Sequence, residues 1–316
     1  MPHRQMVMQR ARGLEWVGPT HVPMLAIAGD SAAGKTTITR GLVQALGGNR
    51  ITSLCSDDYH RYDRTERKTL PFTPLHPDCN YLPIMEQHLQ LLALGQPILK
   101  PVYEHATGQL VRPILVEPGD FVIVEGLFPL WSKLSRACFD VTAYLDLPES
   151  IRRDWKVRRD TSQRGYSPEQ VLAELERREP ESAAYIRPQR AHADIVIRFS
   201  PIPGREDRDE PLSALLLLRP TIAHPDLGDI LGSDTRDAIH LKLLRDDDGK
   251  PVDALHIHGY AEPEHSREIQ ERIWAHLEVD EPLPDSLGVV GEGARSEPLA
   301  ITQLILLYHL IQATQH

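Results

Sequence analysis

The chain has few cysteines, no long hydrophobic run and no excess of positive charge, and each shortage excludes a class of protein. Its three cysteines, Cys55, Cys79 and Cys138, have no CxxC spacing and leave one over in any disulfide scheme. Neither a disulfide scaffold nor a zinc site is therefore indicated. We expect a protein of the reducing cytoplasm.

Membrane spans and a basic surface are lacking as well. The aliphatic runs at 215–218 and 304–307 are far shorter than the roughly 20 apolar residues that cross a membrane. Lysine and arginine number 35 against 45 aspartate and glutamate residues, a net charge of −10. Bulk charge therefore argues against a nucleic acid or an anionic membrane as partner, and any anionic ligand must be held locally.

What the sequence does have is an alternation of short apolar runs and helical stretches. Strands are predicted at 24–28, 51–54, 121–124, 141–145 and 195–199, and helices from about 35 and near 83–94, 149–163 and 167–178. This order favours an α/β fold with a parallel sheet and helices on both faces. Ser167 and Gln170 have the spacing of a capping box at the start of the last of these helices.

The pattern changes beyond residue 200. An antiparallel hairpin is predicted from 239–244 and 254–258, and two amphipathic helices are predicted near 263–277 and 297–312. No motif with its own chemistry occurs there. We therefore divide the chain into an N-terminal extension (1–22), a core (23–200) and a C-terminal extension (201–316) that lengthens the sheet and supplies an oligomer surface.

Residues 29–36 match the P-loop pattern G-x-x-x-x-G-K-[ST]. The match follows a predicted strand and opens a predicted helix, where backbone N–H groups can bind phosphates. In such a loop Lys35 bridges the β- and γ-phosphates and Thr36 binds Mg²⁺. We predict a P-loop NTPase-type sheet. Its predicted nucleotide-binding residues are Gly29, Asp30, Ser31, Ala32, Ala33, Gly34, Lys35, Thr36 and Thr37.

The P-loop alone leaves the class of nucleotide-binding protein open. No NKxD and no LSGGQ motif occurs, and Asp229–Gly232 matches the GTPase DxxG pattern by letter only. GTPase and ABC-type classes are therefore disfavoured. The apolar run 121–124 ends in Glu125, at the place of a Walker-B acid that would orient Mg²⁺ or its water. A surface glutamate at a strand end is the alternative.

Charged side chains follow the second predicted strand, in the segment SDDYHRYDR. At the carboxyl edge of a parallel sheet, such residues face the crevice where ligands bind. Asp57 and Asp58, followed by His60, Arg61 and Arg64, suit a carboxylate base surrounded by groups that hold an anionic substrate. The residues alone do not separate Asp57 from Asp58, and a solvated loop of mixed charge stays an alternative.

A third cluster reverses the overall charge, because residues 150–164 hold six basic residues against two acidic ones. On a helix, Lys156, Arg159 and Asp160 share one face and can converge on one point. Arg164 stands at the expected helix end, where a mobile lid could carry it onto the phosphates. A solvated charged face is the alternative.

The motifs GDSAAGKTT, SDDYHRYDR, KPVYEHATG, VIVEGLFPLW and DWKVRRDTSQRGYSPEQVL stand in the order found in one family. The chain resembles the phosphoribulokinase and uridine kinase family over about residues 24–199, most closely the dimeric plant and cyanobacterial form. The resemblance implies a cytoplasmic homodimer that uses ATP and Mg²⁺ to phosphorylate D-ribulose 5-phosphate to ribulose 1,5-bisphosphate. Another sugar-phosphate or nucleoside kinase of the family is the alternative, and a nucleotide-binding regulator without turnover is a more remote one.

The resemblance also implies roles for individual residues. Asp57 is the implied base that deprotonates the sugar hydroxyl. Thr36, Glu125 and Asp160 are the implied residues at Mg²⁺. The implied catalytic cations are Lys35, Lys156, Arg159 and Arg164. His60 and Arg64 are the implied contacts of the sugar phosphate, and Tyr103 and His105 are implied to lie beside the substrate. Arg61, from the charged segment, is a further predicted substrate contact.

The chain departs from the plant-type pattern at one cysteine position. The resemblance implies that, in plant-type members, a P-loop cysteine pairs with the cysteine before the DDYH segment. Here Cys55 occupies the second position, but Ala33 occupies the first, and the C-terminal regulatory pair is absent. We expect no thiol switch through the P-loop. Cys55, beside the positive loop, is expected to have a lowered pKa and to react with alkylating agents.

Overall fold

The computed structural model describes residues 21–201, 212–231, 237–277, 279, 281–291 and 293–315. The predicted N-terminal extension lies outside these ranges except for its last two residues, and so does most of the expected boundary after residue 200. Within the described residues, no helix is both long and apolar enough to cross a membrane.

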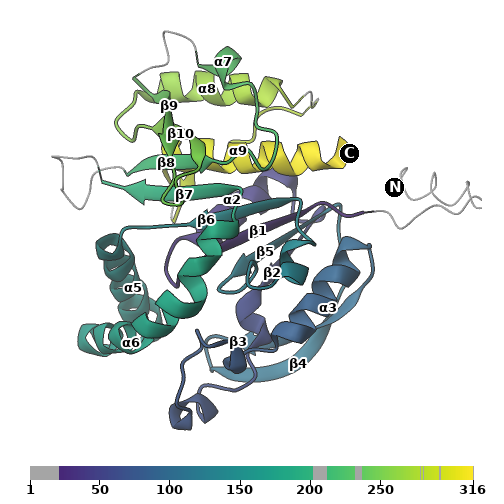
Figure 1. Cartoon of the computed structure of the whole chain (residues 1–316), viewed down its shortest axis with the longest axis vertical. Coiled ribbons are helices and arrows are strands. Elements are labelled where there is room, and N and C mark those ends of the chain that lie inside the picture. The colour runs from purple at the N-terminus through teal and green to yellow at the C-terminus, as the bar shows by residue number, and fades with distance from the viewer. Residues whose placement is uncertain are drawn as a thin grey trace, which may run out of the picture.

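An eight-stranded sheet forms the centre of the molecule (Figure 1). In spatial order, its strands are β2 (Ile51–Cys55), β5 (Phe121–Gly126), β1 (Met24–Gly29), β6 (Val141–Leu145), β7 (Ile195–Ser200), β8 (Ser213–Leu218), β10 (Pro251–Ile257) and β9 (Ile239–Arg245). The first five strands are parallel, and each later strand runs antiparallel to its neighbour. The predicted α/β class and the predicted C-terminal hairpin are both confirmed.

Helices and two small hairpins surround this sheet. The helices are α2 (Lys35–Leu46), α3 (Leu82–Ala93), α4 (Lys133–Arg136), α5 (Glu149–Arg164), α6 (Pro168–Glu181), α7 (Leu227–Ile230), α8 (Pro263–Ala275) and α9 (Glu297–Gln312). The small hairpins pair β3 (Ile98–Glu104) with β4 (Gln109–Val116) and β11 (Val289–Val290) with β12 (Ala294–Arg295). Short helical turns include η1 (Ser56–Tyr59) and the π-helical η4 (Ser182–Ile186).

Alternate residues of β1 pack against different layers. Leu25 and Ile27 belong to a hydrophobic cluster that includes α2 and α9, whereas Met24 packs in a second cluster with α3. Every residue of β1 is buried. This strand, which leads directly into the P-loop, is therefore fixed on both faces, as its continuous apolar pattern predicts.

Helix α9 joins the C-terminal extension to the helix that follows the P-loop. It is not amphipathic, contrary to prediction, because 12 of its 16 residues are buried. The side-chain N–H of Gln303 donates to the backbone carbonyls of Thr37 (3.2 Å) and Ile38 (3.3 Å), and its oxygen accepts the N–H of Gly288 (2.7 Å). Gly41 permits this approach, since a Cβ there would lie 2.1 Å from the Gln303 amide.

Several elements escaped prediction, among them the β3–β4 hairpin and strand β8. Strand β4 is almost wholly exposed, and β3 and β4 carry Pro101 and Pro113, so neither burial nor alternation marks this hairpin. Strand β8 reads SALLLL, which shows no alternation, although its buried residues do alternate in the structure. Strands β3 and β8 matter for the rest of the molecule. Strand β3 supplies part of the candidate site, and β8 connects the parallel sheet to the C-terminal hairpin.

Helices α5 and α6 lie side by side at one edge of the molecule (Figure 1). The predicted capping box is present at the start of α6, where Ser167 and Gln170 exchange hydrogen bonds of 2.9 and 3.3 Å. Pro180 lies within the last turn of α6, and the chain then widens into η4. The charged stretch at 150–164 is therefore on a helix, as predicted.

Two histidines tie α9 to the loop before α7. Nε2 of His224 lies 2.7 Å from the carbonyl of Arg219 and donates to it, which leaves Nδ1 to accept from Nε2 of His309 (3.2 Å). Burial, with the charge of His224 adding to it, lowers the pKa of His309 to about 3.

Acid should therefore destabilise the fold. Between pH 6.5 and about 3 the unfolded chain binds a proton at His309 that the folded chain does not. The contribution of His309 to the free energy of unfolding is complete above pH 6.5. Below that pH it falls by roughly 1 kcal/mol for each unit by which the pH is lowered. Urea unfolding at pH 7.5, 6.0 and 5.0 should show a shallower pH dependence for His309→Gln than for the unsubstituted chain. Equal slopes would contradict this assignment.

Candidate active site

The P-loop connects β1 to α2 through two glycines in conformations that L residues rarely adopt. Gly29 has φ 153°, and a Cβ there would lie 2.9 Å from the carbonyl oxygen of Leu145. Gly34 has φ 91° at the start of α2, and Ala32 also has a positive φ of 65°. Left-handed residues of this kind bring successive backbone N–H groups together in an anion-binding concavity. Nζ of Lys35 lies over the loop and donates to the carbonyls of residues 29 (2.9 Å) and 30 (2.8 Å).

Thr36 and Glu125 meet at the carboxyl end of β5. The hydroxyl of Thr36 donates to Oε1 of Glu125 (3.1 Å), while Oε2 of Glu125 is buried without a partner. Burial raises the pKa of Glu125, with Lys35 and Thr36 opposing the shift. A buried carboxylate oxygen left open beside a threonine hydroxyl is a donor set that fits Mg²⁺. The Walker-B interpretation of Glu125 is thus supported by geometry.

The structure separates Asp57 from Asp58, which the sequence alone does not. Asp58 accepts hydrogen bonds from the Lys100 ammonium and from the backbone N–H of Tyr103 (3.1 Å), both on β3. The Lys100 and Asp58 side chains are 9% and 16% exposed, so this is a largely buried ion pair. Asp57 has no such partner, and its Oδ1 is buried and unbonded. Asp57 is therefore the carboxylate that is open to a ligand.

The charges around Asp57 keep it ionised. Burial alone would raise its pKa, but the charges of His60, Lys35, His105 and Arg178 together lower it. Burial lowers the pKa of His60 itself to about 4, so that ring is neutral near pH 7. The charges of Lys35 and Arg178 therefore help to keep Asp57 ionised at neutral pH, and Asp57 can accept a proton there.

Beside Asp57, aromatic rings and guanidinium groups form a second part of the site. His60 donates from Nδ1 to Oδ1 of Asn80 (2.7 Å), and its ring lies edge-on to Tyr103 at 4.9 Å. Arg67 donates to the hydroxyl of Tyr103 and lies 4.7 Å from its ring centre. The ring of His105 lies on Tyr103 as well, at 5.1 Å.

Arg64 and Arg61 have different surroundings. The guanidinium of Arg64 donates to the backbone carbonyl of His105 (2.5 Å), and its charge is felt at Arg164 on α5. Arg61 is exposed, and its guanidinium lies over the rings of Tyr62 (5.7 Å) and Tyr81 (5.4 Å). The structure therefore brings Arg64 to the site and gives no support for Arg61 there.

Arg67 is the residue that the sequence analysis missed. Its NH1 group is buried and has no hydrogen-bond partner. Arg67 follows the motif SDDYHRYDR by three residues. Its guanidinium is held by Tyr103, which lies on a hairpin that was not predicted. No local sequence signal could have found it.

Asp160 contacts three of the cationic side chains of α5. Its carboxylate accepts from Lys156 (3.0 Å) and Arg159 (2.8 Å), and Arg164 lies 3.4 Å away. Burial alone would raise the pKa of Asp160, but Arg159 and Lys156 lower it below its usual range. The predicted shared face is therefore real. A carboxylate surrounded by three cations is better suited to position them than to bind Mg²⁺, the role that the resemblance implied.

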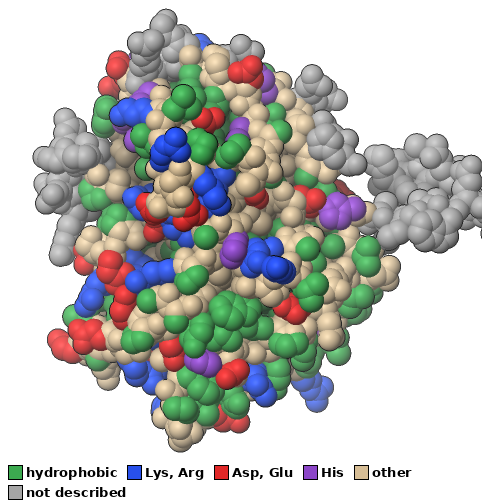
Figure 2. Space-filling view, viewed as in Figure 1, with side chains coloured by type: hydrophobic (Ala, Val, Ile, Leu, Met, Phe, Trp, Pro, Cys, Tyr) green, Lys and Arg blue, Asp and Glu red, His purple; other side chains and the backbone are tan. Residues whose placement is uncertain are grey.

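Polar atoms without partners are concentrated in this site. Among the described residues, eight buried side-chain N or O atoms lack a hydrogen bond, and four of them belong to Asp57, Arg67, Glu125 and Arg159. Buried polar groups are otherwise nearly always paired. Two open carboxylate oxygens and two open guanidinium donors therefore indicate a ligand that carries hydroxyl and anionic groups. Over the face in Figure 2, Lys and Arg side chains are mixed with Asp and Glu, so the attraction for anions is local.

The family model for "Phosphoribulokinase / Uridine kinase family" matches residues 24–203, more than half of the chain. The chain belongs to this family. A phosphoribulokinase of Synechocystis sp. is 39% identical over 198 residues, which cover 63% of this chain and 60% of that protein. This chain thus spans less than two thirds of the length of that relative.

Other members of the phosphoribulokinase and uridine kinase family are similar at greater distance. A uridine kinase of Deinococcus deserti is 30% identical over 184 residues, 55% of this chain and 86% of that protein. The solved structure of phosphoribulokinase from Rhodobacter spheroides covers 79% of this chain and 98% of its own, with TM-score 0.56 and 17% identity. The latter likeness supports the fold of the family.

The pKa values of the three cysteine thiols contradict the reactivity expected for Cys55. Burial, with the charges of Asp57 and Glu125, raises the pKa of Cys55 well above its ordinary value. Burial also raises the pKa of Cys79 to about 11, and raises that of Cys138. All three cysteines are free. The expectation of a lowered Cys55 pKa was wrong, because it took account of the P-loop and overlooked first the burial of the thiol and then the neighbouring carboxylates.

Alkylation should accordingly be slow in the folded protein. At pH 7.5, iodoacetamide should modify each thiol far more slowly in the native chain than in urea, because the thiolate is the nucleophile. Mass spectrometry of digests would give a rate for each cysteine. Rapid native labelling of Cys55 would contradict the assigned environment.

Asp58, which forms an ion pair, should matter for stability, and Asp57, which forms none among the described residues, should matter little. Lys100→Met leaves a buried carboxylate unpaired, which typically lowers the free energy of unfolding by about 3 to 5 kcal/mol. Adding Asp58→Asn to Lys100→Met should restore part of the loss, and Asp57→Asn alone should change stability by less than about 1 kcal/mol. Chemical unfolding measures all three variants. Unchanged stability in Lys100→Met would remove the distinction between the two carboxylates.

Proposed function

We propose that the chain is an ATP-dependent kinase that converts D-ribulose 5-phosphate to ribulose 1,5-bisphosphate. The 39% identity to a protein named phosphoribulokinase supports this assignment within the family. The observation that carries it is an ionised Asp57 with an open oxygen, which feels the charges of His60 and His105. Arg67 acts electrostatically on His60 and Arg159 acts on His105, and both guanidinium groups have open N–H donors. A sugar hydroxyl fits the carboxylate, and a phosphate already present on the sugar fits the guanidinium groups.

The proposed reaction divides the work between the two parts of the site. The P-loop from Gly29 to Thr37 holds ATP, and Asp57 accepts the proton of the attacking sugar hydroxyl. Lys35, Lys156, Arg159 and Arg164 stabilise charge on the transferring phosphoryl group. Thr36 and Glu125 would hold Mg²⁺, which neutralises phosphate charge when bound.

On the acceptor side, His60, Arg64 and Arg67 would bind the sugar phosphate together with the rings of Tyr103 and His105. His60, Arg67 and His105 each contact Tyr103, and Arg64 donates to the backbone carbonyl of His105. His60 and His105 also act electrostatically on Asp57. The homodimer and the cytoplasmic location implied by the resemblance remain predictions, and so does the division of the chain at residues 22 and 200.

A nucleoside acceptor is the second candidate, because relatives named uridine kinase match the same part of the chain. Guanidinium groups with open donors favour the phosphorylated acceptor, since a nucleoside has no anionic group for them to bind.

An acceptor panel tests the proposal. ADP release should be measured with ribulose 5-phosphate, uridine, pantothenate and glycerate at equal concentrations. We expect a marked preference for ribulose 5-phosphate, and Asp57→Asn should lower kcat by roughly 10²- to 10⁴-fold with nucleotide binding retained. Equal or faster turnover of a nonphosphorylated acceptor would refute the assignment. Asp58→Asn is the matched control, in which loss of turnover should follow loss of folded protein.

A further inference from the structure

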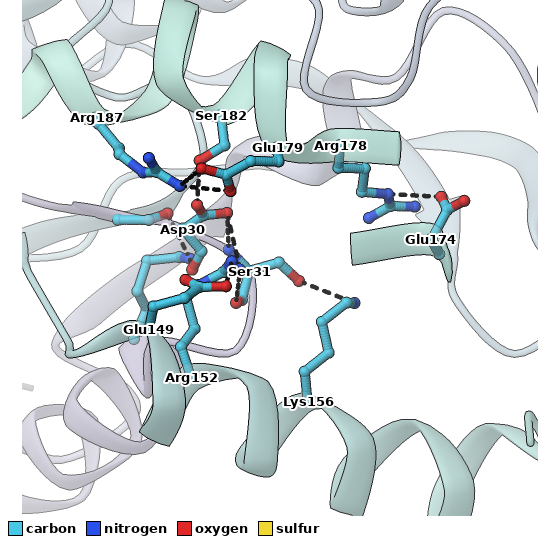
Figure 3. A network of polar contacts seen from close by, with 12 residues as sticks. Asp30, Ser31, Glu149, Arg152, Lys156, Glu174, Arg178, Glu179, Ser182 and Arg187 are labelled. Carbon is cyan, nitrogen blue, oxygen red and sulfur yellow. Dashed lines mark hydrogen bonds and ion pairs between the residues drawn. The ribbon is translucent and has the colours of Figure 1, made fainter. Parts of the chain in front are cut away.

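Asp30 stands in the P-loop but its carboxylate points to the surrounding helices (Figure 3). It is only 6% exposed. One oxygen accepts the backbone N–H of Ser31 (2.8 Å) and lies 3.5 Å from the Arg152 guanidinium, and the other accepts the hydroxyl of Ser182. The P-loop pattern places no demand on this position. An acid so close to a phosphate-binding loop opposes anion binding by its charge, so its presence needs another explanation.

The partners of Asp30 belong to two different helices. Arg152 lies in the first turns of α5, where Glu149 holds its guanidinium with two hydrogen bonds of 2.8 Å. Its remaining NH1 group donates to the backbone carbonyl of Ser31 (3.4 Å). Ser182 is the first residue of η4, immediately after α6. Asp30 is therefore the point at which the P-loop meets both α5 and the end of α6.

The face of α5 that meets the P-loop also carries its cations. Lys156 follows Arg152 by one helical turn, and its Nζ lies 3.5 Å from the hydroxyl of Ser31 while it donates to Asp160. Trp155 touches the loop at another point, since a Cβ added to Gly34 would lie 3.4 Å from its ring. A shift of α5 against the loop would therefore displace Lys156 and the cations beyond it.

We propose that Asp30 is a positioning residue, which holds Arg152 and Ser182 and thereby sets where Lys156 and the later cations of α5 lie relative to the P-loop. The proposal rests on the proposed function insofar as it predicts kinetics. Its structural part, the docking of α5 on the loop, does not depend on which acceptor is phosphorylated.

The kinetic test uses Asp30→Asn, Ser182→Ala and the double variant. Displacing the cations should lower kcat by roughly 10- to 100-fold, while the dissociation constant of ATP changes little. The loss in the double variant should be smaller than the sum of the two single losses, because both variants act through the same carboxylate. Ser167→Ala is the matched control: it removes the cap of α6 without touching Asp30 and should leave kcat of the folded protein unchanged.

The pH profile separates positioning from loss of folded protein. Burial, with the charge of Arg178 adding to it, lowers the pKa of Lys156 to about 8. If α5 loosens and water reaches Lys156, its pKa rises toward the ordinary value, and the alkaline limb of kcat/KM moves to higher pH. Loss of folded protein would lower the whole profile without moving that limb.

A fluorescence measurement keeps the inference independent of the activity. Acrylamide should quench Trp155 more strongly in Asp30→Asn and Ser182→Ala than in the unsubstituted chain or in Ser167→Ala, with Trp155→Phe versions giving the background. The proposal would be overturned if Asp30→Asn kept the kcat and the alkaline limb of the unsubstituted chain. It would also be overturned if Ser167→Ala lost as much kcat as Asp30→Asn. If no acceptor is phosphorylated, the proposed function fails, and quenching still decides the role of Asp30: unchanged quenching refutes it, and increased quenching supports it.

Discussion

Charge buried around the P-loop must be paired, and the few groups that are not paired define the site. Asp58 is neutralised by Lys100, and Asp160 by Lys156 and Arg159. Leaving such charges without partners in a water-poor interior would be strongly unfavourable. The open atoms of Asp57, Glu125, Arg67 and Arg159 are therefore meaningful, because the protein satisfies their neighbours and leaves these four for a ligand.

Much of this arrangement could be predicted where the relevant contacts are local in sequence. The apolar run of β1, the P-loop and the start of α2 follow each other directly, and the shared face of Lys156 and Asp160 needs only helical spacing. The choice between Asp57 and Asp58 required Lys100, 42 positions beyond Asp58 on a hairpin without a clear strand pattern.

The failures have the same physical origin. Helix α9 is buried on nearly every side, and the polar Gln303 on it reads as a surface residue until its contacts with α2 are seen. The pKa of Cys55 is raised first by burial and then by Asp57 and Glu125, and Glu125 reaches Cys55 only when β2 and β5 pair. Periodicity reports which face of an element is apolar. It does not report which distant polar group a side chain will meet.

The contact of Gln303 with the carbonyl of Thr37 also bears on how the protein is made, because it joins residues 266 positions apart. At a synthesis rate of roughly 5 to 20 residues per second, α2 waits about 13 to 53 seconds for this partner to be added. During that interval the helix that follows the phosphate-binding loop lacks the layer that covers it in the finished molecule. The nucleotide site is thus completed only after Gln303 has been added, 266 positions beyond the residue of α2 that it contacts.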